Sequence, residues 1–209
     1  MKNSAFNRLR EEEREVRKQL IIEATLTLLE KKSFDQIGMR DIAAEAGISP
    51  ASLYRYFPGQ TDLLMETFLS DIENKLMYFH QGITNGTIKD TTSFAIDIVD
   101  LLLENEATFQ MMSYMMIKAD ISENLLKKFN FMMKNFFERI NTIFKISGID
   151  LDTNTLVHVF FSSLAGIVMT FRNYPSEDKN SLKEHIRKLA VISAYAFTQK
   201  NVSDFIKHS

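Results

Sequence analysis

The sequence predicts an all-α protein. Only 7 glycines and 3 prolines occur among 209 residues, and a chain so poor in turn-forming residues spends most of its length in helices. Apolar residues also recur at helical spacing through most of the chain. The composition, 45% hydrophobic and 25% charged with a formal net charge of −2, is that of a globular protein, and the length is sufficient for a hydrophobic core.

The composition also excludes several function classes. Because the chain has no cysteine, it has no disulfide framework, thiolate metal site, iron–sulfur cluster or cysteine nucleophile. No apolar run approaches the roughly 20 residues of a membrane span, and no signal-peptide pattern opens the chain, so we expect a cytoplasmic protein with no membrane partner. The sequence contains no HExxH, GxSxG or P-loop motif. We therefore expect no enzymatic activity, no metal and no cofactor.

Glycines and prolines, which interrupt helices, divide the chain into helices of unequal length. Glycines and prolines concentrate between Gly38 and Gly59, which predicts short helices there. A first long helix is expected at residues 11–32 and another at 61–81, with a loop at 82–90. The remaining helices are expected at residues 91–104, 105–118, 122–146, 153–173 and about 179–200.

This layout predicts two domains. A unit of short helices occupies residues 1–58, and a larger helical bundle occupies residues 59–209. A domain of about sixty residues is marginal on its own. We therefore expect the first unit to pack against the helix at 61–81.

Residues 37–57 (IGMRDIAAEAGISPASLYRYF) predict two short helices joined by a tight turn. Gly38 is a suitable N-cap, and Asp41, three positions later, can reach back to the N–H of the cap. Gly47 supplies the left-handed residue that ends the first helix, and Ser49 caps the second. Two short helices joined in this way form a helix-turn-helix, whose second helix can enter the major groove of DNA.

The second short helix has an inner and an outer side. Leu53 and Phe57, four residues apart, point inward. The outer side is left with Pro50, Ala51, Ser52, Arg55 and Tyr56. Arginine can pair with guanine, serine can donate or accept, and a tyrosine hydroxyl reaches phosphates, so these side chains suit DNA contact. The alternative is a plain helical hairpin with a glycine turn.

The stretch from Ile21 to Leu64 resembles the DNA-binding unit of the TetR family of transcriptional regulators. The resemblance covers about a fifth of the chain. It rests on Ile21, Ile22, Ala24, Arg40-Asp41-Ile42-Ala43, Ala46-Gly47-Ile48-Ser49, Leu53-Tyr54-Arg55-Tyr56-Phe57, Leu63 and Leu64. The rest of the chain agrees with the family only in length and helix count.

The resemblance implies a homodimeric, ligand-responsive repressor that binds a palindromic operator in double-stranded DNA. The residues it assigns to DNA contact are Arg40, Ser49, Pro50, Ala51, Ser52, Tyr54, Arg55, Tyr56 and Gln60. Gly38 replaces the usual Ser or Thr cap of the family, and Tyr56 replaces a frequent histidine. Gln60 replaces a lysine that often contacts the DNA backbone, and the loss of this cation is expected to reduce the salt slope by about 1.

The resemblance also assigns roles to the larger domain. The apolar helices at about 153–173 and 179–200 are implied to pair with their copies in a second subunit as a four-helix interface. Gly166 would then allow close backbone approach, although simple tolerance of a mid-helix glycine is an alternative. A dimer also suits DNA recognition, because two recognition helices related by a twofold axis read a palindrome.

The middle helices carry a set of phenylalanines and methionines whose role the sequence leaves open. They are either plain core or the lining of an adaptable pocket for an apolar effector. The candidate lining residues are Phe109, Met112, Met116, Phe131, Met132 and Phe136. Asp97, Asp100 and Glu104 share one helix face, either as a solvated stripe or as a site for a cationic ligand.

The balance of charge leaves open a second function, that of a protein-interaction module. Residues 1–60 hold 10 Lys or Arg against 9 Asp or Glu, which is little excess charge for a DNA-binding domain. Lys2, Arg8 and Arg10 precede the first expected helix, either as an arm along the DNA or as a disordered terminus. Near neutrality and the missing cation at Gln60 favour the alternative of a protein-interaction module on a TetR-like scaffold, with weak or non-specific DNA binding.

Overall fold

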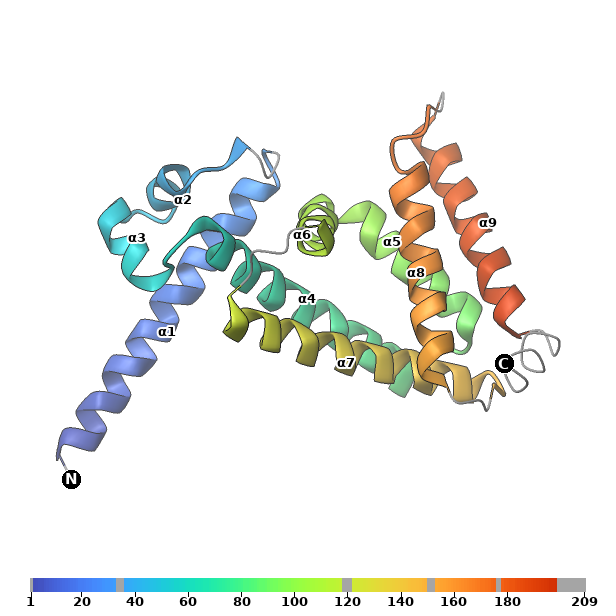
Figure 1. Cartoon of the computed structure of the whole chain (residues 1–209), viewed down its shortest axis with the longest axis horizontal. Coiled ribbons are helices and arrows are strands. Elements are labelled where there is room, and N and C mark those ends of the chain that lie inside the picture. The colour runs from blue at the N-terminus through green and yellow to red at the C-terminus, as the bar shows by residue number, and fades with distance from the viewer. Residues whose placement is uncertain (1, 33–35, 118–121, 150–152, 176–177, 199–209) are drawn as a thin grey trace. The chain divides into compact units, whose positions relative to one another are not determined.

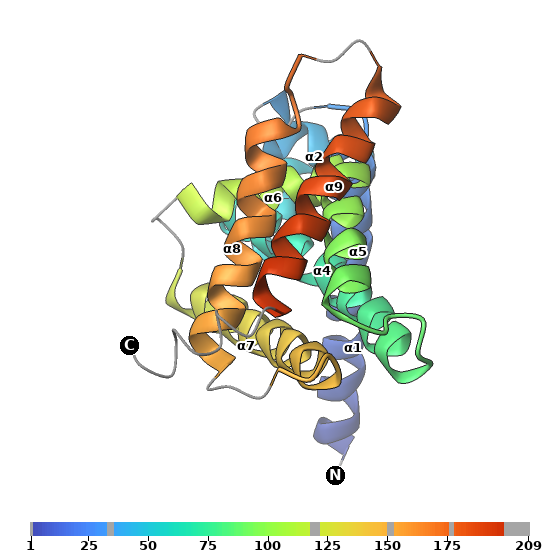
Figure 2. The same ribbon diagram turned by 90° about the vertical axis from the view of Figure 1, so that its right-hand side faces the viewer.

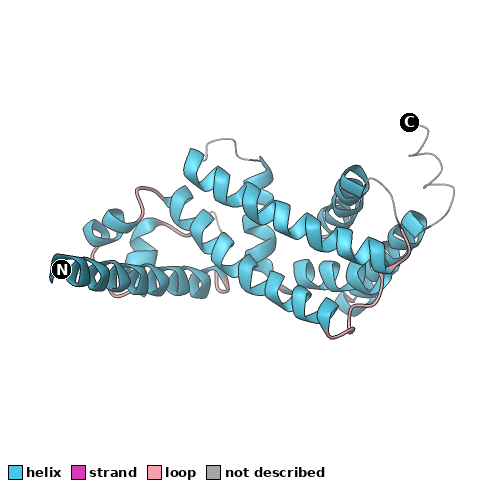
Figure 3. Ribbon diagram, turned by 90° about the horizontal axis from the view of Figure 1, so that it is seen from below, coloured by secondary structure: helices cyan, strands magenta, loops and turns pink. Residues whose placement is uncertain are grey.

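The computed structural model describes residues 2–32, 36–117, 122–149, 153–175 and 178–198, and over these ranges it consists of helices and connecting loops (Figure 3). The all-α prediction is confirmed. The helices are α1 (Lys2–Leu29), α2 (Met39–Glu45), α3 (Pro50–Tyr56), α4 (Gln60–Thr84), α5 (Thr91–Glu104), α6 (Glu106–Ile117), α7 (Glu123–Ile146), α8 (Thr153–Phe171) and α9 (Lys179–Thr198).

The main departure from the predicted bounds lies at the start of α1. This helix begins at Lys2, so the segment considered as an arm or a disordered terminus is helical. Residues 7–15 (NRLREEERE) consist mainly of arginine, leucine and glutamate, which favour helix formation. An ion pair of 3.7 Å between Arg8 and Glu12, one turn apart, supports it further.

The helix α4 also extends beyond the predicted bounds and ends at Thr84. Gly82, expected to open the following loop, is helical and buried. A Cβ atom at this position would lie 2.7 Å from Cδ1 of Ile88, whose N–H donates to the Gly82 carbonyl at 2.9 Å. The loop folds back so closely onto the helix that a side chain at this position would clash, which explains the glycine.

The chain forms two compact units. Unit 1 contains Met1–Ile72 and Glu106–Phe129, and unit 2 contains Glu73–Asn105 and Asn130–Ser209. The helices α4 and α7 contribute residues to both units. The division into domains at residues 1–58 and 59–209 concerns function and stays a prediction.

In unit 1, α2 packs against α1 and α3, and α6 contacts α1 (Figure 1). Polar contacts also join α6 and α4: the Thr108 hydroxyl donates to Asp71 at 2.6 Å, and Thr61 and Tyr114 share a hydrogen bond of 3.2 Å. The core is built mainly from Ile21, Leu28, Leu29, Ile42, Ala43, Leu53, Phe57, Leu63 and Met65. The short helices therefore rest on α1 and on neighbouring helices, as their small size requires.

In unit 2, α5, α8 and α9 lie side by side (Figure 2). A chain of aromatic rings fills the interior: Phe79 and Phe94 have centroids 5.4 Å apart, and Phe136 and Phe161 have centroids 5.2 Å apart. Phe136 also lies 6.5 Å from Phe94, so the four rings are continuous. None of the described helices is both long enough and apolar enough to cross a lipid bilayer.

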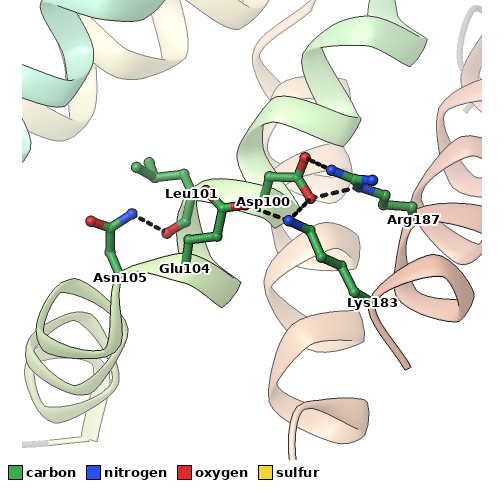
Figure 4. Close-up of polar contacts among 6 residues, drawn as sticks. All are labelled: Asp100, Leu101, Glu104, Asn105, Lys183 and Arg187. Atoms are coloured by element: carbon green, nitrogen blue, oxygen red, sulfur yellow. Dashed lines mark hydrogen bonds and ion pairs between the residues drawn. The ribbon is translucent and has the colours of Figure 1, made fainter. Parts of the chain in front are cut away.

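Charged side chains join α5 to α9 (Figure 4). Asp100 accepts two hydrogen bonds from Arg187, at 2.8 Å from Nε and 2.5 Å from Nη2. Lys183 pairs with Glu104 and lies 3.9 Å from Asp100. The interpretation as a solvated stripe is therefore wrong for Asp100, whose side chain is only 18% exposed beside α9, whereas Glu104 is 60% exposed and agrees with it.

Candidate nucleic-acid interface

The turn between α2 and α3 forms as the sequence predicts. The N–H of Gly38 donates to Oδ2 of Asp41 at 2.9 Å, which caps the start of α2. Gly47 has a φ of 66°, the left-handed conformation that glycine adopts without strain. Ile48 then donates to the Ala43 carbonyl at 2.9 Å, which closes the end of α2 and directs the chain into α3.

The helix α3 presents one apolar side to the core and its other sides to the surface. Its N-cap is Ser49, whose hydroxyl oxygen accepts from the N–H of Ser52 at 3.1 Å, and Pro50 occupies the first turn. Leu53 and Phe57 are buried, as predicted. The remaining side chains of α3 are thereby held at the surface of unit 1.

A chain of hydrogen bonds runs along the exposed side of α3. The hydroxyls of Ser49 and Ser52 lie 3.0 Å apart, and Nη2 of Arg55 donates to the Ser52 hydroxyl at 3.1 Å. A guanidinium has five N–H donors, so this contact orients Arg55 and leaves other donors for a base or a phosphate. The arrangement offers a positioned cation with two hydroxyls beside it, a set of groups that suits base edges and phosphates.

The sequence-predicted DNA contacts all fall within unit 1, and most lie on α3. The exposed members are Arg40, Ser49, Pro50, Ala51, Tyr54 and Arg55, and the partly buried members are Ser52, Tyr56 and Gln60. Gln60, the first residue of α4, donates from Nε2 to the backbone carbonyl of Ile37 at 2.6 Å. Its amide therefore holds the segment before α2, and its contact with DNA stays a prediction.

The surface beside α3 contains arginines of α1, of which the sequence interpretation considered only Arg10, as part of a possible arm along the DNA. Arg10, Arg14 and Arg17 of α1 line an open groove of about 340 Å³ together with Glu13, Arg55 and Tyr56. We call this surface the arginine groove. Arg17 donates to Glu13 at 2.6 Å and also hydrogen-bonds with Tyr56, and these two partners raise the pKa of Arg17 above its usual value. These arginines of α1 are spaced by four and three residues, which places them on one side of a helix, and this spacing was the signal in the sequence that could have revealed the groove.

The candidate effector residues divide between the two units. Phe109 is partly buried and Met112 is buried in unit 1, whereas Met132 and Phe136 are buried in unit 2. Phe131 is 67% exposed on α7, and the side chain of Met116 lies outside the described residues. Because Phe136 belongs to the aromatic interior of unit 2, the structure gives this part of the set a packing role.

A second exposed surface lies on α8 and α9 of unit 2. Ile192 and Tyr195 are 64% and 63% exposed, and Val159 and Met169 are also exposed large apolar residues. The two helices are joined by a hydrogen bond of 2.8 Å between the hydroxyls of Ser163 and Ser193. Around the described residues, no cluster of three or more histidines or carboxylates is placed to hold a metal ion.

Comparisons with known proteins agree with this geometry. Residues 21–67 match the family model described as bacterial regulatory proteins, tetR family. The HTH-type transcriptional repressor KstR of Rhodococcus jostii is 35% identical over 57 residues. This match covers 27% of the chain and 27% of the repressor, so the chain spans about a quarter of the length of that relative.

The fold of the whole chain is also similar to solved structures. A Mesorhizobium loti protein assigned to the TetR family of regulators superposes with a TM-score of 0.67 at 18% identity, covering 88% of this chain and 96% of that one. The regulator FadR of Bacillus subtilis, solved with stearoyl-CoA, gives a TM-score of 0.62 at 20% identity, covering 84% and 98%. These likenesses establish the fold.

Proposed function

Because the chain belongs to the TetR family of bacterial regulatory proteins, we propose that it is a ligand-responsive transcriptional repressor that binds a palindromic operator as a homodimer. A small apolar effector would bind the C-terminal domain and change the affinity for DNA. Because this role requires access to DNA, the proposal includes action in the cytoplasm. The protein performs no chemical reaction in this role.

The observation that carries the proposal is the exposed polar side of α3. Leu53 and Phe57 fix the helix on the core, and Ser49, Ser52 and Arg55 form a hydrogen-bonded set on the outside. Arginine recognises guanine through O6 and N7, and serine can donate to or accept from base edges. A helix whose positioned side chains all point outward in this way suits insertion into the major groove.

The homodimer is supported by the apolar surface on α8 and α9. Ile192 and Tyr195 are large apolar side chains, and covering them with a second copy lowers the free energy of the assembly. At Gly166 of α8, a Cβ atom would have no neighbouring atom within 4 Å, so this position has room to receive another helix. A recognition helix of 7 residues reads few bases, and a second copy doubles the site read.

The effector is proposed to be apolar because the candidate lining residues are phenylalanine and methionine, which adapt to apolar ligands. The structurally similar FadR was solved with stearoyl-CoA, a ligand with a long apolar chain. The helix α4 has residues in both units and is therefore the element proposed to carry the response. Coupling is reciprocal, so operator DNA must weaken effector binding by the factor by which the effector weakens DNA binding.

The alternative function is a protein-interaction module with weak or non-specific DNA binding. It is favoured by the near balance of charge in residues 1–60 and by the amide of Gln60, which donates to Ile37 where a lysine would offer a cation to DNA. Sequence-specific competition separates the two functions, because phosphate contacts alone carry no sequence information.

Selection of bound fragments from a random duplex library, repeated over a series of salt concentrations, tests the proposal. The full-length protein is first unfolded and refolded, which strips any ligand bound during purification. An enriched palindrome whose affinity falls with salt supports the repressor function and supplies the operator sequence. Retained dimerisation without an enriched motif favours the interaction module.

A further inference from the structure

One face of α1 changes from apolar to basic along the helix. In its C-terminal half, Ile21, Thr25 and Leu28 face the core of unit 1 and are buried. Steps of three or four residues toward the N-terminus continue this face through Lys18 and Arg14. The face that anchors α1 to the domain therefore continues, beyond the protein core, as a row of cations.

The cation nearest the core, Lys18, contacts other residues of unit 1. The ammonium of Lys18 lies 5.6 Å from the ring centroid of Phe57, and its side chain is largely covered. Lys18 also lies 4.0 Å from Glu66, the carboxylate of α4 that pairs with Lys128 at 2.5 Å. This cation is thus engaged within unit 1, and the arginines that precede it extend past the point where the protein covers the helix.

These arginines continue directly into the exposed side of α3. The arginine groove contains Arg10, Arg14 and Arg17 from α1 and Arg55 from the last turn of α3, with Glu13 as its single acid. The hydrogen bond between Arg17 and Tyr56 joins the two helices at this point. All six lining residues belong to unit 1, so their placement relative to α3 is part of one compact body.

We propose that the arginine groove binds the phosphates of the DNA strand that borders the major groove entered by α3. This inference rests on the proposed function and extends the DNA contact from α3 to the N-terminal half of α1. A helix in the major groove has a phosphate strand on either side within about 12 Å, the width of that groove. Guanidinium groups bind phosphate oxygens in bidentate fashion, and several at helical spacing follow a strand.

The placement of Glu12 helps to reconcile a basic groove with the weak net charge of residues 1–60. Glu12 pairs with Arg8 across one turn at 3.7 Å, and neither residue lines the arginine groove. The groove itself combines four arginines with one glutamate. The charges are therefore separated by helix face, and a near-neutral total is compatible with a strongly basic local surface.

The test measures the affinity of the full-length protein for its selected operator, and for an unrelated duplex, between about 50 and 300 mM potassium chloride. The variants are Arg14→Gln and the triple change of Arg10, Arg14 and Arg17 to glutamine. Arg8→Gln is the matched control, because it removes the same charge from the same helix outside the groove. Arg14→Lys keeps the charge and is expected to retain most of the salt slope.

The inference predicts that Arg14→Gln reduces the salt slope by about 1 and weakens binding about threefold to tenfold on both duplexes, and that the triple variant loses more. The triple variant is expected to select the same sequence motif, because phosphate contacts do not read bases. Arg8→Gln is expected to leave affinity and slope unchanged. Thermal unfolding of each variant confirms that the fold is intact.

Three results distinguish failure of this inference from failure of the proposed function. An enriched motif for the wild type, with an unchanged salt slope in the triple variant, overturns the inference and leaves the repressor function standing. Equal losses in Arg8→Gln and Arg14→Gln also overturn it, since they reveal a general effect of charge. Absence of any motif for the wild type contradicts the repressor function and, with it, the inference.

Discussion

The side-chain amide of Gln60 donates a hydrogen bond of 2.6 Å to the backbone carbonyl of Ile37 and thereby joins the first residue of α4 to the segment that precedes α2. The two residues are 23 positions apart, and the Ile37 side chain is buried. This bond holds both ends of the helix-turn-helix against each other. Gln60 thus has a structural partner at the position where the resemblance implied a contact with DNA.

Replacing this amide is expected to destabilise the protein. Gln60→Ala removes the donor and leaves the Ile37 carbonyl partly buried without it, which lowers the free energy of unfolding by about 1 kcal/mol. Urea denaturation followed by circular dichroism measures the change. Gln81→Ala, at an exposed position of the same helix, is the control and is expected to change stability by less than about 0.5 kcal/mol. Equal changes in the free energy of unfolding of the two variants would contradict a structural role for Gln60.

The hydrogen bond between Arg55 and Ser52 leads to a prediction about specificity. If Arg55 pairs with a guanine, Arg55→Ala weakens operator binding by about 1–3 kcal/mol and relaxes the selected motif at one position of each half-site. Arg55→Lys keeps the charge but loses the bidentate geometry, so it is expected to relax the same position with a smaller loss of affinity. Repeating the library selection with both variants measures the effect. A uniform loss across all sequences would instead indicate that Arg55 contacts phosphate.

The local signals of the helix-turn-helix made it predictable from the sequence. Gly38 with Asp41, and Ser49 with Ser52, are each three residues apart, so capping rules describe them without knowledge of the rest of the fold. Gly47 has the positive φ that the turn requires. The inner side of α3 followed from the spacing of its apolar residues.

Contacts between distant parts of the chain were not predictable in this way. Asp100 and Arg187 are 87 residues apart, and nothing in either local sequence indicates that α5 and α9 are neighbours. Likewise, helical spacing shows that Met132 and Phe136 share a face of α7, yet it cannot tell which residues of other helices that face meets. The arginine groove was missed for the same reason, because the local sequence of neither helix indicates that Arg14 and Arg17 of α1 lie beside Arg55 of α3.

Gly166 offers a test of the proposed dimer that leaves the protomer intact. In one protomer, a Cβ atom at this position meets nothing within 4 Å, so Gly166→Ala is expected to stabilise α8 by about 1 kcal/mol through helix propensity. Gly166→Leu places a larger side chain in the proposed interface and is expected to weaken dimerisation by about 1–3 kcal/mol. Sedimentation analysis over a range of concentrations measures the dissociation constant. A leucine variant that dimerises like the wild type would exclude this part of α8 from the interface.

Asp97 leads to a prediction about pH. Burial, and secondarily the negative charge of Asp100, raise the pKa of Asp97 above its usual value, so ionisation of this carboxyl costs more free energy in the folded than in the unfolded protein. The contribution of this group to stability is therefore fully present below about pH 3.8 and is lost as the pH rises through the raised pKa. Asp97→Asn cannot ionise, so it is expected to raise the urea midpoint near pH 7, with a gain that shrinks toward pH 4. The neighbouring control Asp100→Asn loses charge from the bond with Arg187 and is expected to lower the midpoint near pH 7. A gain of Asp97→Asn that is independent of pH would show that its cause is not ionisation.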